Sequence, residues 1–219
     1  MTDHVKPQKR AYRSIKRADQ VAQTRRDVLA AAGALFRAQG YTAVSMPVIA
    51  REAGVAVETI YRGFGSKAGL FKAVIDAAVA GGSTRADVPV EERPAIRALI
   101  EEPDPRRQIE LYAATQPGIH RRSGALLMAL ARAAGTDSEL DALWREIEAS
   151  RHSGQGRFVG MLASRRALRP GLSVVEGTDG LWALTSVLVY DMLVKIRGWS
   201  VERYERWLAD HLIELLLGR

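Results

Sequence analysis

The stretch SMPVIAREAGVAVETIYRGFGSK, residues 45 to 67, determines how the first part of the chain folds. Its pattern predicts two short helices joined by a tight turn. Ala50 supplies a small residue where the helices cross, and Gly54 tolerates the left-handed backbone that the turn requires. Ile60 gives the second helix an apolar anchor on its inner face. The stretch therefore predicts a helix-turn-helix whose second helix can enter a DNA major groove.

Helical segments are predicted on both sides of this motif. Over residues 20 to 39 the apolar residues recur at three- and four-residue spacing, and Gly40 ends the run. After the motif, Ser66 is placed to cap a further helix that stops at two glycines. These boundaries predict a DNA-binding domain over residues 20–82 and a second domain over residues 83–219.

Positive charge is concentrated in the first part of the chain. The net charge is +7, and residues 1 to 80 hold 13 Lys and Arg against 6 Asp and Glu. Neutralisation of DNA phosphates is the simplest use of this asymmetry, although a basic surface also serves solubility. Residues 1–19 are basic and nearly free of large apolar side chains, which predicts a disordered arm. Such an arm either follows the phosphates or a minor groove, or only solubilises the chain.

Residues 83–219 show helical periodicity and no convincing alternating strand, so the fold class predicted for the chain is all-α. The last two predicted helices cover Val174–Arg197, with a face through Leu181 and Leu188, and Val201–Leu217. Their apolar faces are wider than one core contact requires. This predicts a homodimer that packs through these two helices; the alternative is a thick core within one monomer.

Several classes of protein are not supported by the sequence. The chain has no cysteine, and its four histidines show neither metal-ligand spacing nor a Ser/His/Asp set. The glycine-rich GFGSKAG segment, residues 63–69, matches neither nucleotide-binding loop, and no strand is predicted before it. The most apolar stretch, residues 180–194, is too short to span a bilayer, and the N-terminus lacks an apolar signal core. We therefore expect a cytoplasmic protein that is not an enzyme and needs no cofactor or metal.

Candidate DNA contacts lie on or near the exposed face of the second helix of the motif. They are Val57, Glu58, Thr59, Tyr61 and Arg62. Thr59 can bond a base edge, and Val57 can touch a thymine methyl group. Glu58 can accept from a cytosine amino group, but it equally suits the positive end of the helix.

Residues 24–75 resemble the N-terminal domain of the TetR/AcrR family of transcriptional regulators. The all-helical remainder looks like the ligand-binding and dimerisation domain of that family. This chain departs from the family pattern at Ala56, where Ser or Thr is common, at Gly63, where His is common, and at Gly65, where Pro is common. The matching features are Gly40-Tyr41, Ile49-Ala50, Ala53-Gly54-Val55, Thr59-Ile60-Tyr61, Phe64, Ser66-Lys67 and Leu70-Phe71.

The resemblance also implies roles for individual residues. Tyr61 and Lys67 resemble the phosphate-binding pair of the family, since a hydroxyl and an amino group suit phosphate oxygens. For Tyr61 the alternative is a half-buried packing role. Ser45 is placed both to cap its helix and to contact a phosphate.

Aromatic and methionine side chains of the second domain are candidates for lining an effector pocket. They are Tyr112, Met128, Trp144, Phe158 and Trp182. Taken together, the sequence predicts a ligand-responsive regulator, most simply a repressor, that binds a palindromic operator as a homodimer and is released by a small molecule. The alternatives are a sequence-nonspecific architectural DNA-binding protein, and an enzyme or ligand carrier with a vestigial helix-turn-helix.

Overall fold

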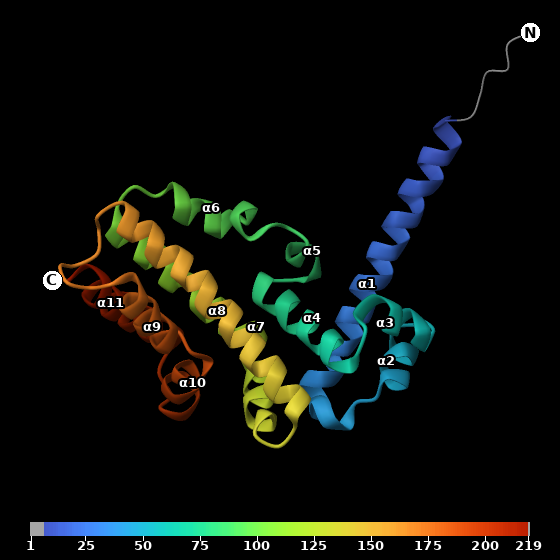
Figure 1. The fold of residues 1–219 in the computed structure, drawn as a ribbon. Helices are drawn as coiled ribbons and strands as arrows, with labels where there is room; N and C mark the ends of the chain where they lie inside the picture. Colours follow the sequence, from blue (N-terminus) through green and yellow to red (C-terminus); the bar gives the residue numbers. More distant parts are fainter. Residues whose placement is uncertain (1–6, 219) are drawn as a thin grey trace, which may run out of the picture. The chain divides into compact units, whose positions relative to one another are not determined.

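The protein is described by a computed structural model, which places the backbone of residues 7–218 and the side chains of residues 16–218. The chain divides into two compact units, Met1–Val74 and Ile75–Arg219. Every regular element between residues 7 and 218 is helical, which confirms the predicted all-α class (Figure 1). Each unit is described below by itself.

Unit 1 is built around a long first helix, onto which the helices of the motif pack. An aromatic cluster fixes its centre, with ring centroids 4.9 Å apart for Phe36 and Phe71 and 5.1 Å apart for Tyr41 and Phe71. Ile49 and Leu70 are also fully buried in unit 1. The helices are α1 (Pro7–Ala43), α2 (Met46–Glu52), α3 (Val57–Phe64) and α4 (Lys67–Ala80), the last of which continues into unit 2.

The start of α1 differs from the disordered arm predicted over residues 1–19. Residues 7–19 are helical and continuous with the packed part of α1, whereas residues 1–6 lie outside the described residues. The physical reason is that no Gly or Pro interrupts residues 8–32, and Lys, Arg, Gln and Ala favour helix. Once the packed part has formed, each further residue adds a hydrogen bond without a new nucleus.

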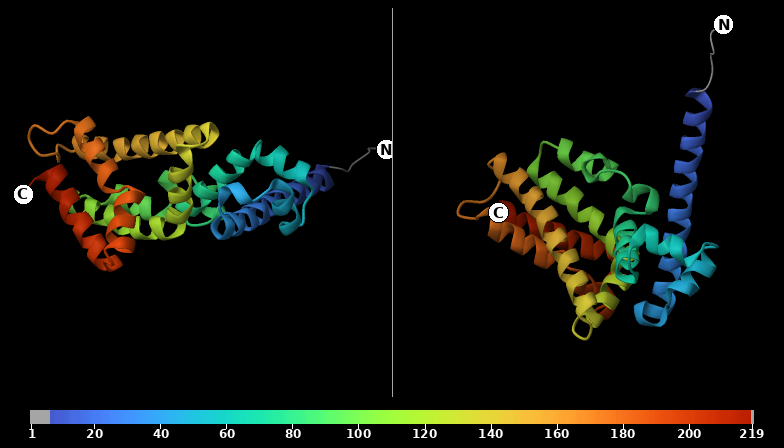
Figure 2. Two further views of the ribbon diagram at one scale, coloured as in Figure 1. Left: turned by 90° about the horizontal axis from the view of Figure 1, so that it is seen from below. Right: turned by 45° about the vertical axis from the view of Figure 1, so that its right-hand side comes forward.

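Unit 2 consists of two long helices and several shorter ones. Helix α7 packs against α8, α10 and α11, while α9 packs against α8 and α11 (Figures 1 and 2). The buried core between them includes Ile109, Val159, Leu181 and Leu208. The helices are α5 (Ser83–Ala86), η1 (Val90–Glu92), α6 (Pro94–Glu101), α7 (Pro105–Ala134), α8 (Ser138–Ser164), α9 (Val174–Leu184), α10 (Val187–Tyr190), η2 (Asp191–Ile196) and α11 (Val201–Leu217).

Helix α7 runs without a break through Pro117-Gly118, a pair of residues that on its own predicts the end of a helix. A proline inside a helix removes one backbone hydrogen bond and costs ~3 kcal/mol. The helix tolerates this cost because it is buried on both sides of the proline, at Ala113 before it and Leu126 after it. Packing of the whole inner face against α8 and α11 outweighs the local penalty.

The opposite error occurs in the segment Val174–Arg197, which the sequence predicts as one helix. The structure divides it into α9, the single turn α10 and the π-helical turn η2. At the break, the Thr185 hydroxyl donates to the Leu181 carbonyl at 2.7 Å, and the Ser186 hydroxyl accepts from the Leu188 N–H at 3.2 Å. These short polar side chains satisfy the helix ends, so the chain can change direction there.

Two further helices of unit 2 begin with a side-chain cap. Asp137 accepts from the N–H groups of Glu139 and Leu140, and Ser200 accepts from the Arg203 N–H. Within residues 7–218, the helices are too short or too polar to cross a membrane.

Candidate DNA interface

The turn between α2 and α3 has the geometry that a helix-turn-helix requires. Gly54 lies in the left-handed region at φ 67°, and the Val55 N–H donates to the Ala50 carbonyl at 3.0 Å. Ile60 is the buried anchor of α3, with 0% of its side chain exposed. The predicted helix-turn-helix and its anchor are therefore confirmed.

The face of α3 opposite Ile60 is open to solvent. Glu58 and Arg62 are exposed, and Tyr61 retains 49% exposure although its ring is large. Val57 and Thr59 are half-buried on the flanks. The face thus offers a carboxylate, a guanidinium, a phenol and a threonine side chain, which are the groups that read base edges and bind phosphates.

The first turn of α3 has no side-chain cap. Ala56 occupies the N-cap position with extended backbone, at φ −72° and ψ 146°, and offers no side-chain acceptor to the first N–H groups. Uncapped N–H groups at a helix start attract anions, because the helix dipole adds partial positive charge there. The departure at Ala56 therefore leaves the first turn of α3 without a side-chain cap.

The two other predicted phosphate contacts lie at the starts of the neighbouring helices. Ser45 occupies the N-cap position of α2, but its side chain makes no capping hydrogen bond, so the predicted cap is wrong in that respect. Lys67 begins α4, and its ammonium lies 4.3 Å above the centre of the Tyr41 ring. This cation–π contact holds the ammonium at the start of α4.

One structural requirement of this site was missed by the sequence analysis. A Cβ atom at Gly69 would lie 2.2 Å from the Phe64 carbonyl oxygen, at the end of α3. Ser66 accepts from the Gly69 N–H at 3.0 Å, which confirms its predicted capping of α4. Gly69 therefore allows the start of α4 to lie close to the end of α3. The only sign of this requirement in the sequence is a glycine in the first turn of a helix. The Phe64 ring lies beneath the Arg25 guanidinium, 4.6 Å away.

The candidate pocket residues of unit 2 separate into two groups. Tyr112 and Phe158 come together as stacked rings 4.8 Å apart. Trp182 lies at the surface with 36% exposure, while Met128 and Trp144 are half-buried on α7 and α8. The structure therefore joins two of the five residues in one ring contact.

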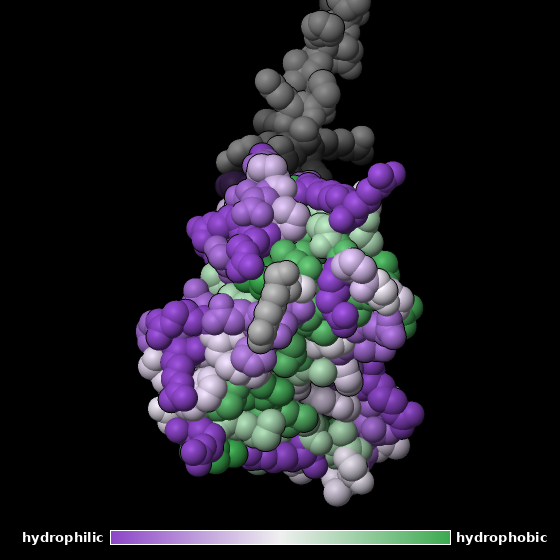
Figure 3. Space-filling view, turned by 90° about the vertical axis from the view of Figure 1, so that its left-hand side faces the viewer, coloured by the Kyte–Doolittle hydropathy of each residue, from purple (hydrophilic) through white to green (hydrophobic). Residues whose placement is uncertain are grey.

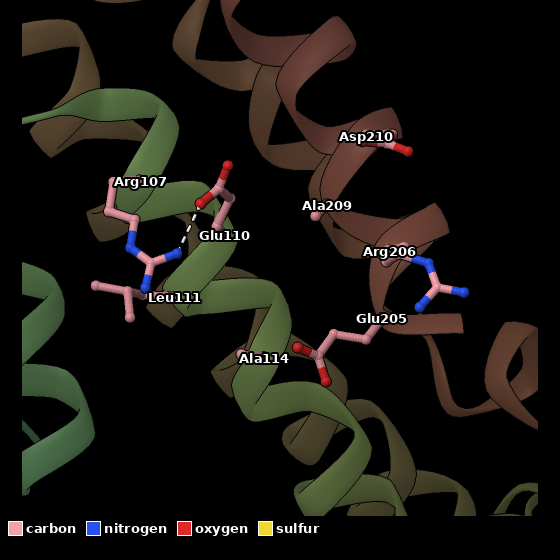
Figure 4. Close-up of a pocket in the computed structure, with 8 residues that line it drawn as sticks. All are labelled: Arg107, Glu110, Leu111, Ala114, Glu205, Arg206, Ala209 and Asp210. Carbon is pink, nitrogen blue, oxygen red and sulfur yellow. Dashed lines mark hydrogen bonds and ion pairs between the residues drawn. The ribbon is translucent and has the colours of Figure 1, made fainter. Parts of the chain in front are cut away.

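A groove of about 340 Å³ lies between α7 and α11 (Figure 4). Figure 4 shows the Glu205 carboxylate reaching toward α7, whereas Arg206 and Asp210 point away from it. Its lining differs from the predicted pocket set and consists of Arg107, Glu110, Leu111, Ala114, Glu205, Arg206, Ala209 and Asp210. Across the residues whose side chains are placed, no group of three or more His, Cys, Asp or Glu is arranged to hold a metal ion.

Comparison with known proteins gives one family match and a shared fold. Residues 28–74 match the family model for bacterial regulatory proteins of the tetR family. No curated protein matches the chain. The matched residues contain α2, α3 and the packed part of α1, so the match covers the helix-turn-helix just described.

Similar solved structures cover nearly the whole chain at low identity. NalD of Pseudomonas aeruginosa, the secondary repressor of the MexAB-OprM multidrug efflux pump, is 24% identical, with a TM-score of 0.64 over 89% of this chain and 97% of that one. A protein from Rhodococcus sp. assigned to the TetR family is 18% identical, with a TM-score of 0.67 over 89% and 99%. A protein from Saccharomonospora viridis assigned as a transcriptional regulator, solved with choline, is 20% identical, with a TM-score of 0.64 over 90% and 99%.

These structures share the fold of both units. The family model matches residues of unit 1 only. Residues 28–74, which contain the helix-turn-helix, are similar to the tetR family of bacterial regulatory proteins.

Proposed function

We propose that the chain is a ligand-responsive transcriptional repressor that binds a palindromic operator as a homodimer and is released by a small molecule. The observation that carries this proposal is the two-sided character of α3. Its anchor Ile60 is fully buried, while Glu58, Tyr61 and Arg62 face solvent. A helix buried on one side and polar on the other, in a family of DNA-binding regulators, is suited to a major groove.

In this proposal the residues of α3 divide between reading and positioning. Val57, Glu58, Thr59 and Arg62 contact base edges, because they lie on the exposed face and flanks of the helix. Tyr61 binds the phosphate backbone. Phosphate contacts of this kind fix the register in which the base-reading residues meet the groove.

Ser45 and Lys67 are proposed to bind phosphates on either side of the reading helix. The Ser45 side chain is exposed and does not cap α2, so the hydroxyl is available for a phosphate oxygen. The basic helical start of α1 adds sequence-independent attraction to DNA.

Dimerisation is proposed to use the surface of the last two helical segments, α9 to η2 and α11. The prediction of a dimer from the sequence depended on the wide apolar faces of these segments. Much of that apolar surface is buried inside the protomer, since Leu181, Leu208 and Leu212 are fully buried. Exposed apolar side chains nevertheless remain along α9, α10 and η2. Figure 3 shows green, hydrophobic surface on the side of the molecule that carries these elements. The exposed residues are Val174, Val175, Trp182, Leu188, Met192 and Ile196.

A small-molecule effector is proposed to bind within unit 2. The stacked Tyr112 and Phe158 lie in its core, and a choline complex of one structural neighbour supports small-molecule binding by this fold. Binding would shift the separation of the two DNA-reading helices in the dimer. A coupling of about 1–3 kcal/mol between effector and operator is sufficient for regulation.

Selection from a random-sequence DNA library tests this function. We expect enrichment of a palindrome with half-sites about 34–36 Å apart or somewhat more, bound at least ~10³-fold tighter than random DNA at the same salt concentration. A ratio near one would instead support the architectural DNA-binding alternative.

A further inference from the structure

A cluster of buried polar and aromatic side chains lies in the core of unit 2, where α7, α8, α10 and α11 meet. The ring of His120 from α7 stacks on Tyr190 of α10 with centroids 4.8 Å apart, and Tyr190 meets Tyr204 of α11 edge-on at 5.0 Å. On the α8 side, the Gln155 amide donates to the Tyr112 hydroxyl at 3.2 Å. We call these five residues the inner polar cluster.

Three members of the inner polar cluster carry buried atoms without a hydrogen-bond partner. They are Nδ1 and Nε2 of His120, Oε1 of Gln155 and the hydroxyl of Tyr204. These side chains are at least 95% buried, with 5%, 5% and 0% exposure. Buried polar groups in folded proteins are nearly always paired, because an unpaired group loses its bonds to water without replacement. Three such groups within one cluster leave donors and acceptors that a bound molecule or ordered water would satisfy.

The inner polar cluster is electrically neutral at physiological pH. Burial, together with the nearby Arg151 charge, lowers the pKa of His120 to about 4, so the imidazole is uncharged and offers one donor and one acceptor. Burial also raises the pKa of Tyr204, which keeps its hydroxyl protonated. Arg151 is itself neutralised by Glu148, at 2.7 Å. A charged molecule would lose its hydration there without meeting a free opposite charge.

The wall of the cluster nearest the surface is irregular. Tyr190 ends α10, a single turn between the break at Thr185–Ser186 and the π-helical turn η2. On the other side Pro117, one turn before His120, removes a backbone hydrogen bond from α7. Short and interrupted helices open at lower free energy than continuous ones, so this wall can admit a ligand.

We propose that the inner polar cluster binds an uncharged, planar aromatic molecule that both donates and accepts hydrogen bonds, with His120, Gln155 and Tyr204 as its polar contacts. One face of the Tyr112 ring is covered by Phe158 and one face of the Tyr190 ring by His120, so such a molecule would stack on the opposite face of either ring. The identification of this ligand as the effector rests on the proposed function, but its binding to the protein does not.

Calorimetric titration of the full chain, without DNA, tests the proposal. The probe is 4-hydroxybenzamide, and its charged analogues are 4-hydroxybenzoate and (4-hydroxyphenyl)trimethylammonium. We expect the neutral probe to bind at least ~10-fold tighter than either analogue, because only it avoids burying an uncompensated charge. Equal binding of a charged analogue, or no binding of the neutral probe up to ~10 mM, overturns the proposal.

Tyr204→Phe removes only the unpartnered hydroxyl and keeps the ring. We expect the variant to bind the probe ~10-fold more weakly, while the free protein is at least as stable as the wild type, because no internal hydrogen bond is lost. His120→Phe, which keeps a stacking ring, is expected to weaken binding similarly. Tyr41→Phe in unit 1 is the matched control and should bind the probe like the wild type. Unchanged probe binding by both cluster variants overturns the assignment.

Operator binding is measured separately on the same preparations. A chain that binds a selected palindrome but does not discriminate the neutral probe refutes this inference alone. A chain that binds the neutral probe through Tyr204 but selects no DNA supports the inference and refutes the proposed regulator.

Discussion

Replacing Gly69 with alanine tests the packing that sets the reading helix α3 against the start of α4. An alanine Cβ would lie 2.2 Å from the Phe64 carbonyl oxygen. This is about 1 Å closer than the ~3.3 Å at which carbon and oxygen make a close contact. The obstacle is backbone, which cannot rotate away as a side chain can, so the two helices must separate.

The expected sign is opposite to the usual effect of this substitution. In an unobstructed helix, Gly→Ala stabilises by up to about 1 kcal/mol. At Gly69 the overpacking cost of about 1–3 kcal/mol exceeds this gain, so the free energy of unfolding should fall. Gly63→Ala is the matched control in α3, because an added Cβ meets nothing within 4 Å there, and it should be neutral or stabilising.

The readout must report on unit 1. All four tryptophans lie after residue 75, so their fluorescence follows unit 2 only. Native-state hydrogen exchange of the amides of residues 45–74 measures the relevant stability directly. Gly69→Ala should speed this exchange, whereas Gly63→Ala should not. If Gly69→Ala is as stable as the wild type, the packing described for α3 and α4 is wrong.

The remaining predictions concern DNA, assembly and pH. Tyr61→Phe should weaken operator binding ~10-fold or more, since a dimer loses two phosphate hydrogen bonds, and equal affinity in gel-shift titrations would exclude the phosphate role. Lys67→Ala should reduce the salt dependence of operator binding by about 2 in log–log slope per dimer, and an unchanged slope would argue against its phosphate contact. Ile196→Lys, which alters a side chain that is 72% exposed in the protomer, should yield monomers in sedimentation experiments, and a stable dimer would place the interface elsewhere. The pKa of His120 is lowered to about 4 in the folded protein, so as the pH falls below ~6.5 the unfolded chain binds a proton before the folded chain does. The free energy of unfolding should therefore drop by about 2 kcal/mol between pH 7.5 and pH 5. His120→Phe should remove that drop in urea titrations, and an unchanged pH dependence would assign it to other groups.

The helix-turn-helix could be predicted from sequence because its determinants are local. Gly54 at a left-handed turn and Ile60 on the inner face act within a few residues of one another. The same holds for the cap at Ser66, whose side chain accepts from the nearby Gly69 N–H. Short-range chemistry of this kind depends little on the rest of the fold.

The features that could not be predicted depend on contacts between distant residues. Pro117 stands inside a helix because packing on both sides holds it there, and nothing adjacent in the sequence signals this. The inner polar cluster joins His120, Gln155 and Tyr204, which come from three helices. Periodicity alone also could not divide the apolar faces of the last helices into residues such as Leu208, buried in the protomer, and Met192, which is 50% exposed.

The central claim is that two copies of this chain read a symmetric DNA site with α3. The most direct test is selection of bound sequences from a random library by the full chain, followed by sedimentation of the selected complex. The claim predicts a palindrome bound by two chains, with recovery of that palindrome abolished by substitutions on the exposed face of α3. Enrichment of no palindrome, or a selected site bound equally well after those substitutions, would contradict it.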